Sequence, residues 1–357
     1  MNVLHLISGR TFTGPAAAAL TDLRALQACG HQVWLASRSG SHLEDGAKRE
    51  GIPFAGGLRL DRGLARIATA PFDARKLRKI CLELKIDIVH VHRSSDHLLA
   101  RLAVGSGAHA KLVRSWHRDP GQSSPGTRGK LARWAAGHLM ASREHKDLLA
   151  EDTDLPVQYL HPGTDTERYR PIEKQEGLRT LTVGLIGRWK RKEDRGQNAV
   201  LELCTRLDLR LPWRLVLLGR GERQPDLERA IAAHARKDRL SMEVTSDEYP
   251  RQAARLDLGL IFATGSDGAS RPALELLACG VPIALADLPG LRELGEDPGC
   301  ARLVRPKDLT DWTKTIEELI REPANLAQMS RQARARAEAV HALPKRGKAL
   351  ADFYAKL

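Results

Sequence analysis

The chain has 357 residues, of which 42% are hydrophobic and 28% charged, and its formal net charge is +13. This length predicts two domains, each able to bury a core of its own, and the composition is typical of a soluble globular protein. No stretch approaches about 18 uncharged apolar residues, which excludes a membrane-spanning helix of the usual kind.

The cysteines and the first residues bear on the cell compartment. The five cysteines form no CxxC pair and show no metal-ligand spacing, which favours reduced thiols in the cytosol and predicts no metal site. The opening MNVLHLISG has no basic segment before its short apolar run, so we interpret it as a first β-strand instead of a signal peptide. A cytoplasmic protein is therefore expected.

The excess positive charge fits several partners. An anionic membrane surface, a nucleic acid or a phosphorylated substrate would each be attracted to it. Part of the charge falls on helical segments, at Arg331, Arg334 and Arg336. A solvated helix surface is the alternative explanation for these residues.

In the first half of the chain, short apolar segments alternate with helical patterns. Strands are predicted at residues 3–7, 32–36, 87–92, 111–116 and 138–141. Helices are predicted between them, including residues 16–29 and 73–85. Strands that alternate with helices indicate a parallel, doubly wound sheet.

A second series of strands and helices begins after the polar stretch 171–179. Its strands are predicted at residues 180–186, 213–218, 258–262, 282–285 and 301–304, and its helices include residues 197–206, 224–235 and 273–278. The predicted fold class is therefore α/β, with two Rossmann-like halves joined near residues 165–180. A helical tail is predicted over residues 325–357, with a break at Pro344.

In doubly wound sheets, ligands bind beyond the carboxyl ends of the strands, so the turns after strands hold the candidate residues. The first such turn carries Gly9 and Gly14 before a helix. Glycines there let backbone N–H groups approach an anion or an acceptor closely, and the helix N-terminus adds positive potential. A loop that only requires glycine dihedral angles is the alternative.

The turn after residues 111–116 carries His117 and Arg118, which are expected to face the ligand side of the sheet. His92, at the end of the preceding strand, is a candidate of the same kind, whereas His90 is expected in the sheet packing. A surface turn with incidental basic residues is the alternative.

In the second half, a turn between a strand and a helix holds five basic residues: Arg188, Lys190, Arg191, Lys192 and Arg195. A diphosphate carries about two negative charges, which Arg and Lys at a helix N-terminus could neutralise as it leaves. Residues 219–222 (GRGE) again place an arginine in the turn that follows a strand. A solvated run of charges is the alternative.

Residues 267–282, DGASRPALELLACGVP, predict a loop, a helix and a strand. Ser270 can cap the helix, and Pro272 is tolerated in its first turn. Glu275 has apolar neighbours on most sides, and a carboxylate in such a helix is costly unless it has a partner. Glu275 is therefore predicted to bind ribose hydroxyls, and Asp267 to bind sugar hydroxyls. A helix-surface glutamate is the alternative.

These residues resemble the GT-B-fold retaining glycosyltransferases of family 4. Asp267, Gly268 and Glu275 match the family's acidic–x7–acidic motif, usually EGFGxxxxE, and residues 278–282 (ACGVP) match its helix-to-strand ending. Residues 162–171 (PGTDTERYRP) resemble its interdomain signature NGVDxxxFxP, and residues 30–33 (GHQV) resemble its GHxV. The four motifs follow the family's order over nearly the whole chain.

The resemblance implies a GT-B architecture, in which two Rossmann-like domains face a cleft. An acceptor-binding domain is expected at residues 1–168 and a nucleotide-sugar-binding domain at residues 169–339, with a C-terminal helix (about residues 340–357) that packs back onto the first. The implied activity is transfer of a hexose from a UDP-, GDP- or ADP-sugar to a hydroxyl acceptor, with retention and without a metal or cofactor.

Family analogy also implies the acceptor and the setting. The acceptor would be a glycan or a lipid-linked molecule in lipopolysaccharide or other surface-glycan biosynthesis. A peripheral position at the inner face of the plasma membrane, on anionic lipid, is expected because basic residues fall in one part of the first half. They are Arg101, Lys111, Arg114, Arg118, Arg128, Lys130 and Arg133.

The resemblance assigns roles to individual residues. Donor contacts are implied for Gly187, Arg188, Gly268, Ala269, Ser270, Arg271 and Glu275. Catalysis is assigned to His117, which faces the donor sugar, to Asp267, and to the basic residues on the diphosphate. Gly9 and Gly14 are assigned to the acceptor or phosphate loop. The family pattern GRxxxxKG places a lysine where this chain has Glu193, so Lys192 and Arg195 are both candidates to join Arg188.

Two other functions fit parts of the sequence. A nucleotide-sugar 2-epimerase or hydrolase shares the two-domain architecture and also binds a diphosphate. A nucleic-acid-binding protein would explain the net charge. Aromatic residues are only 4% of the chain and no nucleic-acid module is recognised, so no nucleic-acid partner is expected.

Overall fold

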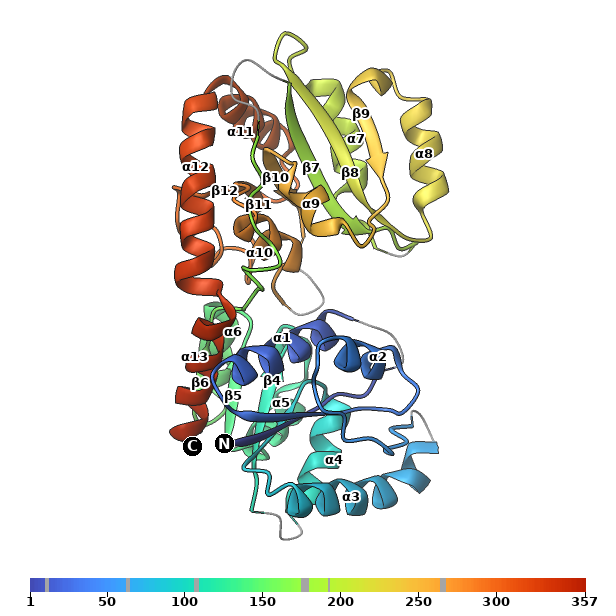
Figure 1. Cartoon of the computed structure of the whole chain (residues 1–357), viewed down its shortest axis with the longest axis vertical. Helices are drawn as coiled ribbons and strands as arrows, with labels where there is room; N and C mark the ends of the chain where they lie inside the picture. Colours follow the sequence, from blue (N-terminus) through green and yellow to red (C-terminus); the bar gives the residue numbers. More distant parts are fainter. Residues whose placement is uncertain (10–12, 62–64, 106–108, 175–179, 192, 264–267) are drawn as a thin grey trace. The chain divides into compact units, whose positions relative to one another are not determined.

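The computed structural model describes residues 1–9, 13–61, 65–105, 109–174, 180–191, 193–263 and 268–357, with the backbone alone at residues 66 and 67. The chain divides into two compact units (Figure 1). Unit 1 comprises Met1–Gly163, Ala342–Leu357 and a short segment that ends at Ala269. Unit 2 comprises Thr164–Thr264 and Ser270–His341.

Unit 1 is built on a parallel sheet, which has six strands among the described residues, in the order β2-β1-β3-β4-β5-β6. The strands are β1 (Asn2–Leu6), β2 (Gln32–Ala36), β3 (Ile88–Val91), β4 (Lys111–Trp116), β5 (Gly137–Met140) and β6 (Val157–Tyr159). The strand order reverses between β1 and β3, because β2 and β3 lie on opposite sides of β1. Sheets of this kind bind ligands at such a reversal.

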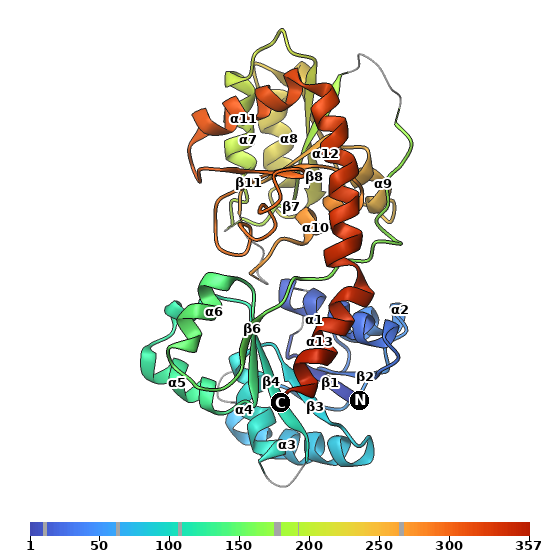
Figure 2. The same cartoon turned by 90° about the vertical axis from the view of Figure 1, so that its left-hand side faces the viewer.

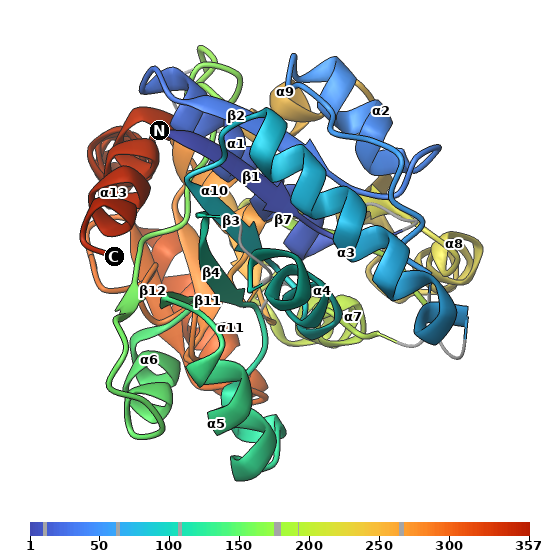
Figure 3. The same cartoon turned by 90° about the horizontal axis from the view of Figure 1, so that it is seen from below.

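Helices cover both faces of this sheet (Figures 1 and 3). They are α1 (Gly14–Ala28), α2 (His42–Arg49), α3 (Ala65–Glu83), α4 (Ser94–Val104), the 3₁₀ turn η1 (Pro120–Gln122), α5 (Pro125–Arg133), α6 (Arg143–Ala150) and α13 (Leu343–Ala355). Near β1, Val3 and Ile7 share a core cluster with residues of α1 and α13, whereas Leu4 and Leu6 share one with residues of α3 and α4. Both faces are buried, which explains the almost continuous apolar strands.

The C-terminal end of the chain belongs to unit 1. Helix α13 packs against α1 (Figure 2). A Cβ on Gly347 would lie 2.0 Å from the carbonyl oxygen of Ala25, so only glycine allows this approach. Pro344 lies in the first turn of α13, where a missing N–H is tolerated. The predicted break in the helical tail therefore lies just before Leu343.

Unit 2 has a parallel sheet of its own, with six strands among the residues that are described, in the order β12-β11-β10-β7-β8-β9. The strands are β7 (Leu181–Arg188), β8 (Trp213–Arg220), β9 (Leu240–Glu243), β10 (Leu258–Ile261), β11 (Ile283–Ala286) and β12 (Ala301–Val304). This is the strand order of a dinucleotide-binding Rossmann sheet, and it reverses between β7 and β10. The predicted α/β class with two parallel sheets is confirmed.

The helices of unit 2 lie on both sides of its sheet (Figure 1). They are α7 (Gln197–Arg206), α8 (Gln224–Ala232), the 3₁₀ turn η2 (Lys237–Arg239), α9 (Tyr249–Ala254), α10 (Arg271–Ala278), α11 (Leu309–Arg321), α12 (Pro323–Arg336) and the π-helical turn η3 (Ala337–His341). Trp213 and Trp312 are fully buried in the core cluster of this unit.

Two strands and the start of one helix differ most from the sequence-based prediction. The edge strands β6 and β9 were missed, because both are short and no residue of β6 is fully buried, so the apolar run that signals a strand is absent. Helix α3 begins at Ala65, well before the predicted start at residue 73. The carboxylate of Asp73 does not cap a helix: it accepts hydrogen bonds from the backbone N–H groups of Arg59 and Leu60, each at 2.9 Å.

Candidate active site

The pairing of β7 with β8, next to the strand-order reversal of unit 2, places two arginines side by side. Strand β7 pairs with β8 on one side and with β10 on the other. Arg188, the last residue of β7, is exposed and in register with Arg220 at the end of β8. Two of the predicted basic positions thus lie at the sheet edge where doubly wound folds bind ligands.

A buried tryptophan shapes this edge. Trp189 is fully buried; its backbone N–H donates to the carbonyl of Arg220 at 3.0 Å, and its carbonyl accepts from the N–H of Arg223 at 2.8 Å. A Cβ on either Gly187 or Gly219 would lie 2.7 Å from the Trp189 ring. A Cβ on Gly219 would also lie 2.1 Å from the carbonyl oxygen of Gly187. Close packing therefore requires glycine at these two strand ends.

One carboxylate organises the basic turn that follows β7. Glu193 accepts hydrogen bonds from Lys190 Nζ at 2.9 Å and from Arg195 Nη2 at 3.0 Å. Both cations lower the pKa of the Glu193 carboxyl, and Lys190 has the larger effect. Arg195 directly precedes Gly196, which has a left-handed φ of +105° and is the N-cap residue of α7. Arg195 therefore lies at a helix N-terminus, whereas Lys192 lies outside the described residues.

The start of α10 has the predicted capping. The Oγ of Ser270 accepts a hydrogen bond of 3.4 Å from the backbone N–H three residues later, and Pro272 lies in the first turn. Both predictions are confirmed. Gly268 has a left-handed φ of +77°, and Ala269 is buried. Asp267 lies outside the described residues.

Glu275 is not a helix-surface residue, because it is only 5% exposed. Its Oε1 accepts a hydrogen bond of 3.0 Å from Arg271 Nη2, and its Oε2 accepts one of 2.7 Å from the hydroxyl of Tyr249. The ring of Tyr169 lies edge-on to Tyr249, with centroids 6.0 Å apart. The side chain of Tyr169 also interacts with Glu275. A carboxylate has about four acceptor positions, so these contacts still leave room for a hydroxyl group of a ligand.

The two tyrosines were missed by sequence reasoning as parts of this site. Burial, and next the charge of Glu275, raise the pKa of Tyr169 and of Tyr249 above that of an ordinary phenol. Both therefore remain neutral hydrogen-bond donors. Tyr169 stands in the segment that resembles the interdomain signature, which offered a signal, whereas nothing in the local sequence connects Tyr249 with Glu275.

In unit 1, the turn after β1 is fastened to the N-terminal end of α4. The Oδ2 of Asp96 accepts a hydrogen bond of 2.9 Å from the backbone N–H of Ser8. A Cβ on Gly9 would lie 3.3 Å from Arg93 Nη2, so Gly9 lies against a guanidinium group. Gly14 is the first residue of α1. The sequence predicted the glycines of this turn but not the arginine and aspartate behind it.

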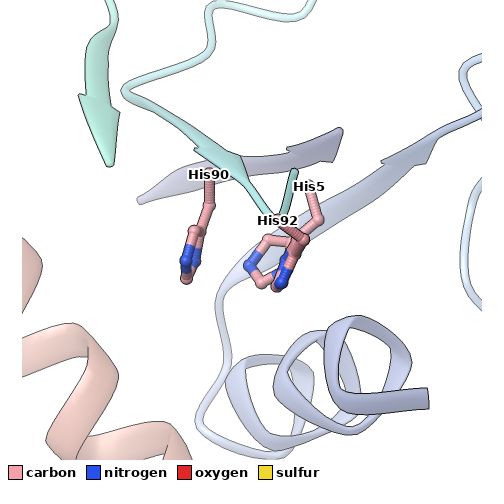
Figure 4. Close-up of side chains that lie close together, drawn as sticks. All are labelled: His5, His90 and His92. Atoms are coloured by element: carbon pink, nitrogen blue, oxygen red, sulfur yellow. The ribbon is translucent and has the colours of Figure 1, made fainter. Parts of the chain in front are cut away.

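His117 directly follows β4 and lies beside a row of buried histidines. Its Nε2 is 2.9 Å from His92 Nδ1, and His92 Nε2 is 3.0 Å from His5 Nδ1. His90, predicted to lie in the packing, is fully buried, and its Nδ1 is 2.7 Å from the hydroxyl of Tyr354. Figure 4 shows His5, His90 and His92 extending toward the same side of the sheet. The sequence singled out three of these histidines but not His5.

Among the described residues, one group has ligand atoms close enough together to approach a metal ion, namely His5, His90 and His92. Hydrogen bonds already engage both nitrogens of His90 and both nitrogens of His92. The rings of His90 and His92 stack, with centroids 4.7 Å apart and 19° between the planes. Lone pairs in two parallel planes do not converge on one ion, so the group is a hydrogen-bond network.

Arg114 does not belong to a basic surface, contrary to the prediction. It is 5% exposed, because alternate residues of β4 point into the packing against α4. Its guanidinium lies 3.8 Å from the centroid of the Trp116 ring and donates to Ser94 Oγ at 2.9 Å. Arg128, another residue of the predicted surface, is engaged by Asp152.

The exposed side of α3 combines apolar and basic side chains. Phe72 is 66% exposed and Leu82 is 50% exposed. The exposed basic residues of the same helix are Arg75, Lys76, Arg78 and Lys79. In the part of the chain that the structure describes, no helix combines the length and the apolar character needed to cross a bilayer.

Comparison with known proteins relates each unit to glycosyltransferases. A family model described as Glycosyltransferase Family 4 matches residues 14–168, and one described as Glycosyl transferases group 1 matches residues 180–322. A solved structure, Anabaena HepE in complex with UDP, matches 100% of both chains at 16% identity, with a TM-score of 0.81. This likeness shows a common fold.

Two curated relatives are similar in sequence. MMP alpha-(1->4)-mannosyltransferase of Mycolicibacterium hassiacum is 27% identical over 204 residues, which are 56% of this chain and 48% of that protein. Phosphatidyl-myo-inositol mannosyltransferase of Mycolicibacterium smegmatis is 23% identical over 304 residues, which are 79% of this chain and 75% of that protein. The chain thus spans about half the length of the first of these relatives.

Proposed function

The chain belongs to glycosyltransferase family 4, and we propose that it transfers a sugar from a nucleotide-diphosphate sugar to a hydroxyl group of a glycan or lipid-linked acceptor. The observation that carries the proposal is Glu275, a buried carboxylate in the same unit as the arginine edge formed by Arg188 and Arg220. A carboxylate suits ribose hydroxyls and arginines suit phosphates, and a nucleotide diphosphate presents both. HepE was solved with UDP, so UDP-sugars are the first donors to test.

In the proposed mechanism, unit 2 binds the nucleotide part of the donor. Glu275 accepts hydrogen bonds from the ribose hydroxyls, while Arg271 and Tyr249 hold its carboxylate in place. Arg188, together with Lys192 or Arg195, contacts the diphosphate. Negative charge grows on the diphosphate as its bond to the sugar breaks, so these cations stabilise the transition state more than the bound donor.

The remaining candidate residues serve the sugar and the acceptor. Asp267 and the backbone of residues 268–271 hold the sugar ring, and His117 contacts the transferred sugar. The acceptor hydroxyl enters near Gly9 and Gly14. The acceptor oxygen forms its bond on the face of the anomeric carbon that the diphosphate leaves, and a phosphate oxygen takes the acceptor proton. This front-face displacement retains the anomeric configuration, and the proposed steps need no metal or cofactor.

We further propose that the protein is cytoplasmic and contacts an anionic membrane surface, in lipopolysaccharide or other surface-glycan synthesis. The support is α3, where exposed Phe72 and Leu82 accompany four exposed basic residues. Anionic headgroups attract such basic side chains, and apolar side chains enter the interface beside them. Sedimentation with anionic and with neutral liposomes tests this part. Equal binding to both, or to neither, would contradict the membrane role and leave the transferase proposal untouched.

The activity is tested by incubating the purified protein with UDP-, GDP- and ADP-sugars, with and without acceptor fractions. We expect one donor to yield a glycoside only when an acceptor is present, with slow hydrolysis in its absence and an unchanged anomeric configuration in the product. Rapid epimerisation or release of free sugar without an acceptor would overturn the proposal in favour of an epimerase or a hydrolase.

A further inference from the structure

A row of hydrogen-bonded histidines extends from His117 into the interior of unit 1. We propose that His92, backed by His5, is a positioning residue that keeps His117 neutral and determines which of its ring nitrogens carries the proton. The inference rests on the proposed function, since His117 is the residue proposed to contact the transferred sugar.

The row follows the pairing of the strands. His5 lies in β1, His92 directly follows β3 and His117 directly follows β4, and these three strands are neighbours in the sheet. The Nδ1 of His5 is 3.0 Å from His92 Nε2, and the Nδ1 of His92 is 2.9 Å from His117 Nε2. The rings of His92 and His117 also stack, with 5.2 Å between centroids and 16° between planes. Both contacts have the length of N–H···N hydrogen bonds.

The interior end of the row is held neutral by burial. His5 is fully buried and His92 is 4% exposed. Burial lowers the pKa of His5 to about 4 and lowers that of His92 well below its ordinary value. His90, which stacks on His92, lowers the pKa of His92 further.

Among the described residues, the charged side chains that act on the interior end of the row come from the two helices packed on this side of the sheet. Asp22 of α1 and Arg346 of α13 act on the pKa of His5 in opposite directions. They also pair with each other, with Arg346 Nε 2.8 Å from Asp22 Oδ1. Tyr354 of α13 faces His90 and is neutral, because burial raises its phenol pKa well above the ordinary value. Among the described residues, Asp22 and Arg346 thus act in opposite directions beside His5, and Arg346 lowers the pKa of His92 further.

The proton count of the row follows from imidazole chemistry. A neutral ring carries one proton, so it donates at one nitrogen and accepts at the other. A protonated His117 would donate at Nε2, and His92 would have to accept at Nδ1. His92 would then donate from Nε2 to His5 Nδ1, which would leave the proton of His5 on its own Nε2.

A proton on Nε2 of His5 is unfavourable. The Nε2 of His5 is buried and has no hydrogen-bond partner among the described residues, and a buried N–H without a partner is rare and costly. A neutral His117 permits the opposite arrangement, with a proton on Nδ1 of all three rings. The row thus resists protonation of His117 and leaves its Nδ1 as the nitrogen with the proton.

Neutrality of His117 matters because glycosyl transfer builds positive charge at the anomeric carbon in its transition state. An imidazolium beside that carbon would repel the developing charge, whereas a neutral ring with a proton on Nδ1 can donate a hydrogen bond without repelling it. The position of the proton thus affects the rate of transfer more than the binding of the donor.

Two amide substitutions separate the two contacts of His92. In His92→Asn the amide nitrogen lies near the place of Nδ1, so the contact with His117 is kept and the contact with His5 is lost. In His92→Gln the amide nitrogen lies near the place of Nε2, so the contact with His5 is kept and the contact with His117 is lost. His90→Asn is the matched control, because it removes a buried ring stacked on His92 without entering the row.

We expect His92→Asn to retain kcat at pH 8. The acid limb of its kcat/KM profile should move up by about one pH unit, which is a tenfold change in the protonation constant of His117. We expect His92→Gln to lose kcat at every pH, with little change in donor KM, and His90→Asn to keep the wild-type profile. Identical pH profiles for His92→Asn and His90→Asn would overturn the proposal.

NMR of protein labelled with ¹⁵N in its histidine rings tests the row without any substitution and without activity. At pH 7 we expect His5, His92 and His117 to be neutral with the proton on Nδ1. An imidazolium signal for His117, a proton on Nε2 of His92, or a shift of these signals with one equivalent of Zn²⁺ would overturn the proposal. A wild-type protein with these spectra but no transferase activity would instead contradict the proposed function alone.

Discussion

The hydroxyl of Tyr249 lies 2.7 Å from Oε2 of Glu275 and donates a hydrogen bond to it. Tyr249 begins α9 and Glu275 lies in α10, so the bond joins two helices of unit 2. Burial, and next the charge of Glu275, raise the pKa of the Tyr249 phenol well above its ordinary value. The tyrosine therefore stays a donor, and one oxygen of the carboxylate keeps a fixed orientation.

Replacing Tyr249 by phenylalanine removes this bond and keeps the ring. We expect the donor KM to rise about tenfold or more with a smaller change in kcat, since a hydrogen bond to a charged group contributes about 1.5–3 kcal/mol. Steady-state kinetics with varied donor measures the effect. Tyr159→Phe, which removes a phenol hydroxyl bonded to His161 in unit 1, is the control. Equal donor KM values for the two variants would contradict the role of Tyr249.

The second basic residue of the diphosphate site can be identified by substitution. Arg195 lies at the N-terminus of α7, where a leaving diphosphate is stabilised best, so we expect Arg195→Gln to lower kcat by about 10²-fold or more. Lys192→Gln is expected to stay within about threefold of the wild type. Glu193→Gln, which frees Arg195 from its carboxylate, serves as the control and should retain activity. A larger loss in Lys192→Gln would assign the role to the lysine.

Part of the donor site could be predicted from local sequence. The cap at Ser270, the proline after it and the burial of Glu275 follow from a serine, a proline and a run of leucines and alanines. The approach of Tyr249 could not be predicted, because it depends on how α9 packs against α10. The basic turn after β7 was recognised, but its pairing with Glu193 depends on a loop conformation that the sequence does not reveal.

The histidine row was beyond sequence reasoning for a different reason. His5 and His92 become neighbours only because β1 pairs with β3, and strand order is set by the crossover connections. Arg114 was assigned to a basic surface because it lies among other basic residues in the first half of the sequence. The alternation of β4 directs it into the packing instead, where a tryptophan ring and Ser94 accommodate it.

The pair formed by Asp22 and Arg346 fastens α13 to α1. Arg346 Nε lies 2.8 Å from Oδ1 and Nη2 lies 3.0 Å from Oδ2 of Asp22, and both residues are buried. Asp22→Asn leaves a buried guanidinium without its counter-charge, and we expect the free energy of unfolding to fall by about 3–5 kcal/mol. Urea unfolding measures this value.

The matched control for this pair lies in the same helix. Asp352 pairs with Lys348 on the exposed side of α13, and Asp352→Asn should change the free energy of unfolding by less than about 1 kcal/mol. The double variant Asp22→Asn, Arg346→Met should recover part of the loss, because it removes the unpaired charge. A loss in Asp22→Asn no larger than that in Asp352→Asn would refute the role of the pair.

Acid should destabilise the protein through the buried histidines of unit 1. Burial lowers the pKa to about 4 for His5 and His138 and to about 3 for His97, and it lowers the pKa of His90 and His92 well below the ordinary value. Between about pH 6.5 and pH 4 the unfolded chain therefore binds more protons than the folded one. The contribution of the neutral, buried histidines to the free energy of unfolding is fully present above pH 6.5 and is lost as the pH falls. His5 alone accounts for about 3 kcal/mol of this contribution.

Urea unfolding at pH 7.5, 6.5, 5.5 and 4.5 measures this dependence. We expect the free energy of unfolding to fall steeply below pH 6.5, and His138→Phe to flatten part of the slope. Substitution of the exposed His109 should leave the slope unchanged. A free energy of unfolding that is constant between pH 7 and pH 5 would show that the histidines are not buried as described.

Binding of nucleotide diphosphates to the wild type and to Glu275→Gln tests the donor site most directly. Isothermal titration with UDP, GDP and ADP should find one nucleotide that binds the wild type. Glu275→Gln keeps the shape of the side chain but loses the charge that attracts the ribose hydroxyls, so we expect its affinity for that nucleotide to fall about tenfold or more. Equal affinities in the two proteins, or no binding of any of the three nucleotides to the wild type, would contradict the assignment of Glu275 and with it the proposed glycosyl transfer.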